Sequence, residues 1–275
     1  MSEHSRTEID TLRSTLLKLR SSASLEDTSQ MLEQLDELSL SVELEREERR
    51  KFVSHVSHEL RVPMTSILGY TDLLRKGIFG PVNDQQLNFL NIIRSNVDRM
   101  AALVSDLSDL SKLETGTLVL ELDACRLQDV VYGVVRNLQP AFADRNQNFE
   151  MIFPADLPQV YADPKRLAQV LTNLLNNANR YTPPGGSISV RIVRDERMAR
   201  LEVSDTGIGI SSEDQSRLFE QFFRSDHAAV REHPGWGLSL SVSKGLVEQM
   251  GGAMGAASKP MEGSTFWFTV PLIVE

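Results

Sequence analysis

Residues 50–114 hold two stretches of apolar residues spaced at alternating steps of three and four, joined by a segment that breaks a helix. This spacing places the apolar side chains on one stripe of a helix. The joining segment, Gly77 to Asp84, contains Gly and Pro and offers Asn83 or Asp84 as the cap of the next helix. The sequence therefore predicts an antiparallel helical hairpin. The stripes are Val53, Val56, Leu60, Pro63, Ile67, Tyr70 and Leu74 in the first arm, and Leu90, Ile93, Val97, Met100, Val104 and Leu107 in the second.

Both arms carry apolar positions outside these stripes, such as Leu73, Leu103 and Leu110. A two-helix hairpin buries little surface alone, so these positions need a further cover. Two hairpins that pair into a four-helix bundle would provide it. The pattern therefore predicts a homodimer.

The first 49 residues are rich in Leu, Glu, Arg and Ser and lack Pro and Gly, which predicts a helix. Leu35, Leu38 and Val42 have the spacing of a helix-pairing seam. The charged residues Glu45 and Arg49 occupy later positions of this seam and interrupt its apolar pattern. A coiled-coil connector and a solvated helix therefore remain alternatives.

From about Thr117 short β-rich runs alternate with helical runs, which predicts an α/β sandwich with one sheet and helices on a face. The fold class is therefore α+β multidomain, with a lead-in at 1–49, a hairpin at 50–116 and a sandwich at 117–275. The predicted strands are TLVLEL, FEMIF, SISVRIV, ARLEVSD and STFWFTVPLIV, and the predicted helices are Leu127 to Ala143, Pro164 to Tyr181 and Leu238 to Met250.

The composition narrows the setting in which this chain works. A net charge of −9 argues against nucleic acid as the main partner. No run of apolar residues is long enough to cross a bilayer, and a single cysteine, Cys125, fits a reducing compartment. The predicted location is the cytoplasm, either as this chain alone or as part of a longer, membrane-tethered protein.

His58 lies between the stripe residues Val56 and Leu60, which places it roughly opposite the stripe. An imidazole held in water by a helix can act as a nucleophile, because much of it is neutral near pH 7. Glu59 could accept the proton of the other ring nitrogen. An inert surface histidine and a metal site with His55 are the alternatives, and the second lacks a third ligand.

A second group of polar residues follows the pattern of a nucleotide pocket. Asn173 and Asn177 share a helix face, and their amide oxygens suit Mg²⁺ beside a triphosphate. Arg180 and Tyr181 on the next turn could reach phosphate oxygens. Asp205 ends a predicted strand, where a carboxylate can accept a hydrogen bond from the exocyclic amine of adenine.

Glycines and hydroxyls complete the predicted pocket. Gly207 and Gly209 would let the backbone approach the base, although an ordinary β-turn explains them as well. Residues 211–234 suggest a mobile lid anchored by its phenylalanines. The lid leads through Gly235 and Gly237 to a helix that begins near Leu238, where backbone N–H groups attract phosphate. Ser264 and Thr265 open the last strand and could face the pocket.

The order and spacing of SHELRVP, NLLNNANRYTP, DTGIGI, LFEQFFR and GWGLSL resemble the successive motifs of bacterial sensor histidine kinases, over roughly residues 50–275. The resemblance implies a dimeric hairpin and an ATP-binding sandwich like that of gyrase and heat-shock chaperones. It implies that His58 accepts the phosphoryl group of Mg-ATP, with Glu59 as acid–base partner. It also implies that an aspartate of a response regulator then receives this phosphoryl group from His58. Asn177 is the implied Mg²⁺ ligand, and the implied ATP-binding residues are Asn173, Asn177, Arg180, Tyr181, Asp205, Gly207, Gly209, Arg224, Gly235, Gly237, Leu238, Ser264 and Thr265.

The sequence departs from the family pattern at several positions. Val62 stands where many members have Thr, and valine cannot orient a water molecule, so we expect weak or absent phosphatase activity towards the partner. Ser239 replaces a glycine and Trp236 adds bulk, which predicts weaker ATP binding or a more ordered lid. Gln221 stands where the lid motif often has Arg.

Two other functions remain in view. An ATPase of the same fold would need a glutamate near Asn173 to activate water, and an amide cannot act as that base. A degenerate kinase could serve as a dimeric scaffold, and Trp236 and Ser239 keep this alternative open. The stimulus and the cognate response regulator cannot be inferred from this sequence.

Overall fold

A computed structural model describes residues 25–154, 156–233 and 235–273. The first element is a helix, α2, Leu25–Arg75, and the chain divides into two units between Val56 and Ser57. The side chains of the predicted seam, Leu35, Leu38 and Val42, lie outside the described residues. The domain limits at 49/50 and 116/117 stay predictions.

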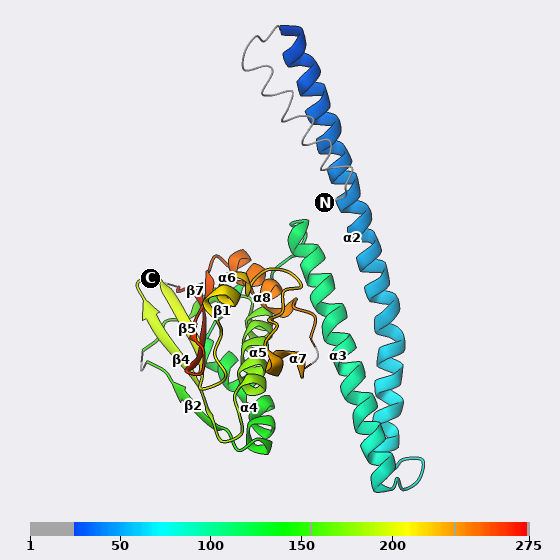
Figure 1. Cartoon of the computed structure of the whole chain (residues 1–275), viewed down its shortest axis with the longest axis vertical. Helices are drawn as coiled ribbons and strands as arrows, with labels where there is room; N and C mark the ends of the chain where they lie inside the picture. The colour runs from blue at the N-terminus through cyan, green and yellow to red at the C-terminus, as the bar shows by residue number, and fades with distance from the viewer. Residues whose placement is uncertain (1–24, 155, 234, 274–275) are drawn as a thin grey trace. The chain divides into compact units, whose positions relative to one another are not determined.

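The turn and the second arm of the hairpin follow the sequence pattern closely. Helix α3, Asp84–Glu114, begins after Asn83, so Asn83 is the cap. The Asn83 side chain accepts a hydrogen bond from the Gln86 N–H at 2.8 Å, and the Gln86 side chain accepts one from the Asn83 N–H at 2.9 Å. This reciprocal pair satisfies two backbone donors that the helix start would otherwise leave without partners. The arms from Ser57 to Arg75 and from Asp84 to Glu114 lie side by side (Figure 1).

The residues that pack between the two arms differ from the predicted stripe. Met64, Val97 and Val104 form the buried cluster, with Leu68 and Ala101 against it. In contrast, four residues of the predicted stripe stay open to solvent: Leu60, Ile67, Tyr70 and Leu74 are 38, 43, 67 and 41% exposed.

The prediction that this stripe is buried within one hairpin is therefore wrong. A contact between two helices covers one row of each. The covered row of α2 includes the small residues Ser57 and Thr71, which allow a close approach. The exposed row needs a different partner.

Leu103 and Leu110 were expected to be covered by a second hairpin, and this is also wrong. Leu110 belongs to the main core of the following α/β part, and Leu103 packs against that core. The end of α3 is thus covered by the same chain.

The α/β part contains a five-stranded sheet, a separate two-stranded sheet and helices. The large sheet has the order β2-β4-β5-β7-β6, with β2 and β4 parallel and the other pairs antiparallel. The small sheet pairs β1 with β3. The strands are β1 Asp123–Cys125, β2 Asn148–Ile152, β3 Val160–Ala162, β4 Ser187–Asp195, β5 Met198–Asp205, β6 Met254–Lys259 and β7 Gly263–Pro271.

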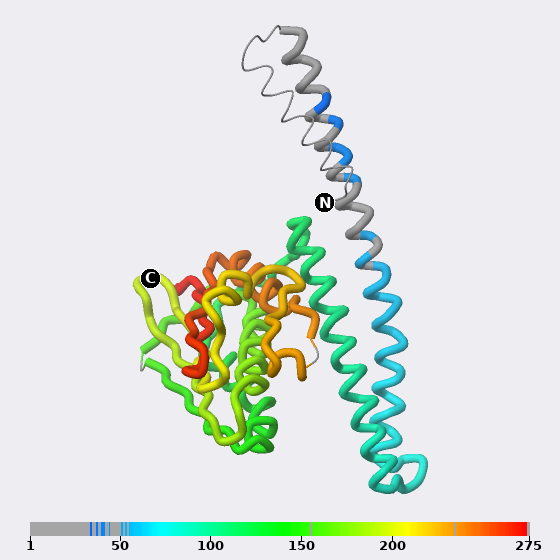
Figure 2. Tube along the Cα trace, in the orientation of Figure 1, coloured from blue at the N-terminus to red at the C-terminus, as the bar shows by residue number. Residues whose placement is uncertain are grey.

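Helices α4, α5 and α8 cover one face of the sheet (Figure 1), and Figure 2 follows the chain from the hairpin turn through α3 into this part. The strands alternate inward apolar and outward polar residues, as β4 does with Ile188, Val190 and Ile192 buried. The helices are α4 Leu127–Asp144, α5 Pro164–Tyr181, α6 Ser212–Arg217, α7 Ala228–Arg231 and α8 Ser239–Gln249. The predicted fold class is confirmed.

The predicted strand TLVLEL does not form. The Thr117 and Leu118 N–H groups both bond to the Lys112 carbonyl, at 2.9 and 3.3 Å, so the chain is still closing the end of α3 and cannot pair with a neighbour. Leu118 then turns into the core. The short strands β1, β3 and β6 were not predicted.

Candidate active site

His58 and Glu59 lie side by side on α2 and both are exposed. The preceding residue, Ser57, is only 4% exposed, so the helix is held from its other side. None of the described contacts joins His58 to the α/β part. The site therefore consists of an open histidine and a separate group of residues around α5.

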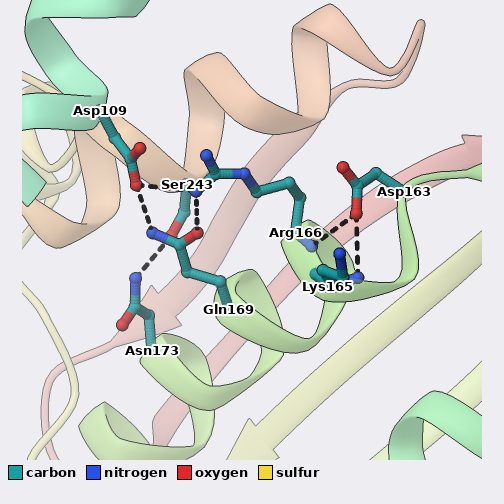
Figure 3. Close-up of polar contacts among 7 residues, drawn as sticks. All are labelled: Asp109, Asp163, Lys165, Arg166, Gln169, Asn173 and Ser243. Carbon is teal, nitrogen blue, oxygen red and sulfur yellow. Dashed lines mark hydrogen bonds and ion pairs between the residues drawn. The ribbon is translucent and has the colours of Figure 1, made fainter. Parts of the chain in front are cut away.

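Helix α5 is fixed at its start by Asp163 and Pro164. The Asp163 carboxylate accepts hydrogen bonds from the N–H groups of Lys165 and Arg166, at 2.9 and 3.2 Å (Figure 3). It accepts another from the Glu121 N–H at 3.0 Å. This cap and a Pro in the first turn set the helix start. Leucines at 167, 171, 174 and 175 are fully buried, which turns the Asn173 and Asn177 face towards solvent.

The Asn173 side chain is tied to α8. Its Nδ2 donates a hydrogen bond of 3.2 Å to the hydroxyl of Ser243, which is fully buried (Figure 3). This bond uses the donor end of the amide and leaves its oxygen as an acceptor. Asn177 lies one turn further on and is half-buried, so both amides of the predicted Mg²⁺ site share one helix face.

Asp205 ends β5 on the side of the sheet that the helices cover. It pairs in register with Ile188 and with Ser264, whose side chains face the same way because residues opposite one another share a face. The Asp205 carboxylate accepts a hydrogen bond of 2.8 Å from the Gly207 N–H and another from the Ser264 N–H. Burial nevertheless raises the pKa of Asp205 to about 6.

Thr265 lies on the opposite face of the sheet from Asp205. Its hydroxyl shares a 2.9 Å hydrogen bond with that of Ser204, the residue opposite it in β5. The Ser264 hydroxyl instead lies 2.9 Å from that of Ser258. Of the two hydroxyls predicted for the pocket, only Ser264 lies on the Asp205 side.

The loop after Asp205 is locked against the turn between β6 and β7. Gly209 has φ +67°, and a Cβ there would lie 1.9 Å from the Lys259 carbonyl oxygen. The Ile208 carbonyl accepts a hydrogen bond from the Met261 N–H at 2.8 Å. The Ile208 N–H donates to the Tyr181 carbonyl at 3.3 Å, which joins this loop to the end of α5.

Two guanidinium groups meet beside Gly235. Arg180 Nη1 and the Arg224 guanidinium each lie within 4 Å of the position that a Gly235 Cβ would take. Arg224 donates to the Gly235 and Val230 carbonyls, both at 2.7 Å, and so ties the lid segment together. The Tyr181 ring meets the ring of His233 edge-on at 6.0 Å. His233 is half-buried.

The lid leads into α8 through a constrained turn. Gly237 has φ +70°, and a Cβ there would lie 2.4 Å from the Phe223 carbonyl oxygen. Leu238, 2% exposed, precedes the first residue of α8, Ser239. Within the lid, Phe219 packs on the core, whereas Phe222 is 55% exposed, so the phenylalanines do not all serve as anchors.

The structure thus brings part of the predicted nucleotide residues to the last turns of α5: Asn173, Asn177, Arg180 and Tyr181 lie on this helix, and Gly207 and Gly235 lie close to Tyr181 and Arg180. A cavity of about 240 Å³ is lined by residues of β2, β4 and the end of β5, and Asp205 is the one predicted nucleotide residue in its lining. A larger cavity, about 780 Å³, lies between α4 and α5 and is lined by none of these residues. The amides of Asn173 and Asn177 lie on α5, and the loop after Asp205 is joined to the end of this helix by the hydrogen bond from Ile208 N–H to the Tyr181 carbonyl.

Two family models match this chain. Residues 48–116 match the His Kinase A (phospho-acceptor) domain, and residues 162–274 match the histidine kinase-, DNA gyrase B- and HSP90-like ATPase. The sensor protein GacS of Pseudomonas syringae pv. syringae is 35% identical over 268 residues, which cover 93% of this chain and 29% of GacS. The chain belongs to the bacterial sensor histidine kinases.

Other relatives agree with this assignment. The histidine-protein kinase BarA of Escherichia coli K12 is 35% identical over 260 residues, which cover 89% of this histidine kinase chain and 28% of BarA. The chain spans less than a third of the length of these curated relatives.

Solved structures of histidine kinases are similar to this one. Full-length ShkA in complex with AMPPNP matches with a TM-score of 0.67 and 26% identity, over 82% of this chain and 46% of ShkA. AdeS of Acinetobacter baumannii matches with a TM-score of 0.56 and 25% identity, over 79% of this chain and 98% of AdeS. Among the described residues of this histidine kinase, no helix combines the length and the apolar character needed to span a membrane.

The residues that depart from the family motifs differ in their exposure and contacts in this histidine kinase. Val62 is 58% exposed, one turn after His58, and Trp236 is 63% exposed. Gln221 donates a hydrogen bond of 3.0 Å to the Glu114 carboxylate of α3. No sequence pattern points to Ser243, because its contact with Asn173 joins residues 70 positions apart.

Proposed function

We propose that this chain phosphorylates His58 from Mg-ATP and passes the phosphoryl group to an aspartate of a response regulator. The observation that best supports this proposal is the pairing of an open histidine on a helical hairpin with the polar side chains of α5 and the glycine-containing segments that contact its last turn. An ATPase or a scaffold would have no need of the exposed imidazole.

The chemistry assigned to His58 is nucleophilic. A neutral ring nitrogen attacks the γ-phosphorus, a nitrogen–phosphorus bond forms, and the bond to the bridging oxygen breaks so that ADP leaves with the electron pair. Glu59, next in the chain, takes the proton of the other ring nitrogen. Phosphoryl transfer needs little covalent help, so the remaining residues act by positioning and by neutralising charge.

The pocket residues fit the two ends of ATP. Asp205 would accept a hydrogen bond from the adenine amine, and Arg180 would reach phosphate oxygens. Asn177 would hold Mg²⁺ with its amide oxygen, and Asn173, whose donor end is occupied by Ser243, offers a second oxygen on the same face. Mg²⁺ supplies neutralisation of the phosphate charge when bound.

The exposed stripe of α2 supports a homodimer. Leu60, Ile67, Tyr70 and Leu74 repeat at steps of three, four and seven, and Ile93 and Met100 of α3 are also exposed. A contiguous apolar surface on a helical hairpin is typical of a partner-binding face. A second copy would complete the four-helix bundle, and the surface around His58 would then receive the response regulator.

Incubation with γ-labelled ATP tests the proposed activity. We expect label on the protein that is stable to base and lost in acid, as for a nitrogen–phosphorus bond. Steady release of inorganic phosphate without protein label would identify an ATPase. Neither label nor release would identify a scaffold.

Nucleotide affinity should depend on pH through Asp205. Burial raises the pKa of this carboxyl to about 6, so the carboxylate that accepts the amine proton is present above about pH 6 and is lost below it. We expect ATP affinity to be constant from pH 7 to 8 and to fall as the pH drops from 6 to 5. The ATP dissociation constants of wild type and Asp205→Asn are measured by calorimetry at each pH. Their ratio cancels the titration of the ATP phosphates, which affects both proteins equally. A ratio that does not change with pH would contradict the assignment of Asp205.

A charge on the exposed stripe should split the homodimer. Ile67→Glu would place a carboxylate in the apolar interface twice, because a two-fold dimer repeats each contact. We expect a dissociation constant raised at least about 100-fold, measured by light scattering over a concentration series. Met261→Glu is the control, since Met261 is a more exposed apolar residue, at 82%, outside the hairpin. Equal masses for the two variants at every concentration would show that the stripe is not part of the dimer interface.

A further inference from the structure

Asp205, Ser264 and Ser258 form one row across three neighbouring strands, on the side of the sheet that the helices cover. Asp205 of β5 lies opposite Ser264 of β7, and Ser264 lies opposite Ser258 of the edge strand β6. Residues opposite one another share a face, with their Cβ atoms about 5 Å apart. The Ser264 side chain therefore has the Asp205 carboxylate on one side and the Ser258 hydroxyl on the other.

The hydrogen bonds of Ser258 fix the direction of its hydroxyl group. Its proton is donated to the Gly263 carbonyl at 2.7 Å, because a carbonyl oxygen can only accept. Its oxygen accepts a hydrogen bond of 2.9 Å from the Ile210 N–H. A hydroxyl has one proton, so the 2.9 Å contact between the Ser258 and Ser264 hydroxyls must use the proton of Ser264.

The Ser264 hydroxyl is therefore left as an acceptor beside Asp205. Ser264 is 8% exposed, and its hydroxyl proton points to Ser258, away from Asp205. The Asp205 carboxylate accepts its hydrogen bonds from the backbone N–H groups of Gly207 and Ser264. Both side chains thus offer oxygen lone pairs and no proton to a base. An amine satisfies them, whereas a carbonyl oxygen in the same place would meet acceptors only.

The Gln215 side chain fastens Ser258 from outside the sheet. Its Oε1 accepts a hydrogen bond from the Ser258 N–H at 3.2 Å, and its Nε2 donates to the Ser258 carbonyl at 2.9 Å. These are the two bonds that a further strand would make with the free edge of β6. Nε2 also donates to the Ile210 carbonyl at 3.0 Å. Gln215 thus holds Ser258 in the position at which its oxygen receives the proton of Ser264.

We propose that Ser258 sets the base preference of the nucleotide site by holding the proton of the Ser264 hydroxyl away from Asp205. Gln215 supports this preference by fixing Ser258. Both are positioning residues, because they act on the base through Ser264. The inference rests on the proposed function, in which Asp205 accepts a hydrogen bond from the adenine amine. It adds the residues that make the site reject a base with a carbonyl oxygen in place of that amine.

Calorimetric titration with ATP and with inosine triphosphate (ITP) tests the preference, because ITP has a carbonyl oxygen where ATP has the amine. Burial raises the pKa of Asp205 to about 6, so the titrations are done near pH 8, where this carboxyl is ionised. Wild type should bind ATP at least about tenfold more tightly than ITP. Ser258→Ala frees the Ser264 proton for the base carbonyl or for Asp205. The ratio of the ITP to the ATP dissociation constant should then fall at least about fivefold, with weaker ATP binding and tighter ITP binding.

Gln215→Leu tests the support of Ser258 from the other side of the edge strand. It keeps the approximate size of the side chain and removes the paired bonds to the Ser258 backbone. The ratio should fall in the same direction but by less, about threefold, because Ser258 keeps its hydroxyl. The double variant should have the ratio of Ser258→Ala, because Gln215 acts through Ser258. A further fall in the double variant would overturn the role of Gln215.

Two control variants separate the base preference from a general loosening of the sheet. Ser258→Thr keeps the hydroxyl and should keep the wild-type ratio. Ser204→Ala should keep it too, although it removes a hydroxyl contact of the same length, 2.9 Å, to Thr265 on the opposite face. The inference would be overturned if Ser258→Ala kept the wild-type ratio. It would equally be overturned if Ser258→Thr or Ser204→Ala lowered the ratio as much as Ser258→Ala.

Failure of the proposed function gives a different result, because calorimetry needs no phosphoryl transfer. A protein that prefers ATP through Ser258 but is never labelled on His58 would refute the kinase proposal and support this inference. A wild type that binds ATP and ITP equally well would overturn the inference together with the role of Asp205, whatever the labelling shows.

Discussion

His58→Gln is expected to reduce labelling from γ-labelled ATP to background, a loss of roughly 10³-fold or more, because no other residue replaces a missing nucleophile. Gln is close to His in size, and His58 is exposed without a described partner, so the fold should not change. The ATP dissociation constant should therefore equal that of wild type. The measurements are acid-labile label per chain and calorimetric ATP binding on the same samples.

His55→Gln is the matched control, because His55 is exposed one turn away on the same helix. It should label at the wild-type rate. Retention of base-stable label in His58→Gln would show that another residue accepts the phosphoryl group. Loss of label in both variants would indicate a defect of the helix and not of one nucleophile.

Gly209→Ala is expected to remove most of the ATP affinity. At φ +67° an added Cβ strains the backbone by about 1–2 kcal/mol. At this position it also meets the Lys259 carbonyl oxygen at 1.9 Å, so the loop after Asp205 must shift away from the β6–β7 turn. Because Asp205 and the Tyr181 carbonyl border that loop, we expect ATP binding to weaken about tenfold or more, or about 1.4 kcal/mol.

Gly185→Ala separates the clash from the backbone strain. Gly185 has φ +79°, yet nothing lies within 4 Å of the position of an added Cβ. It should lose about 1–2 kcal/mol of unfolding free energy in urea and keep its ATP affinity. If both variants bound ATP equally well, the Gly209 loop would not belong to the nucleotide site.

Helix α5 shows how much a local pattern can predict. Its predicted limits, Pro164 and Tyr181, are those of the structure. Asp163 provides the cap, Pro164 suits the first turn, and buried leucines at helical spacing provide the core face. All of these signals lie within one helix length, and the same holds for the alternating residues of β4 and β5.

Segments that depend on distant partners were predicted less well. TLVLEL has a strand-like composition, but the bonds that close α3 use its first N–H groups. The apolar row of α2 was identified correctly as a row, but its assignment to the inside of one hairpin was wrong, because apolar spacing does not name the neighbour. Thr265 and Ser264 are adjacent in a strand and so face opposite sides, and only the strand register shows which of them lies on the Asp205 side.

The sequence alone determined the elements with strong periodicity, the order of the family motifs and the residue types of the site, because each is encoded within a few turns of chain. The tertiary structure decided which faces meet. The Asn173–Ser243 bond, the hydrogen bonds of Asp109 with Arg166 and Gln169, and the contact of Leu110 with the ATP-binding domain join residues far apart in the chain. Such contacts depend on how whole elements pack, and packing is a property of the assembled core that no local window contains.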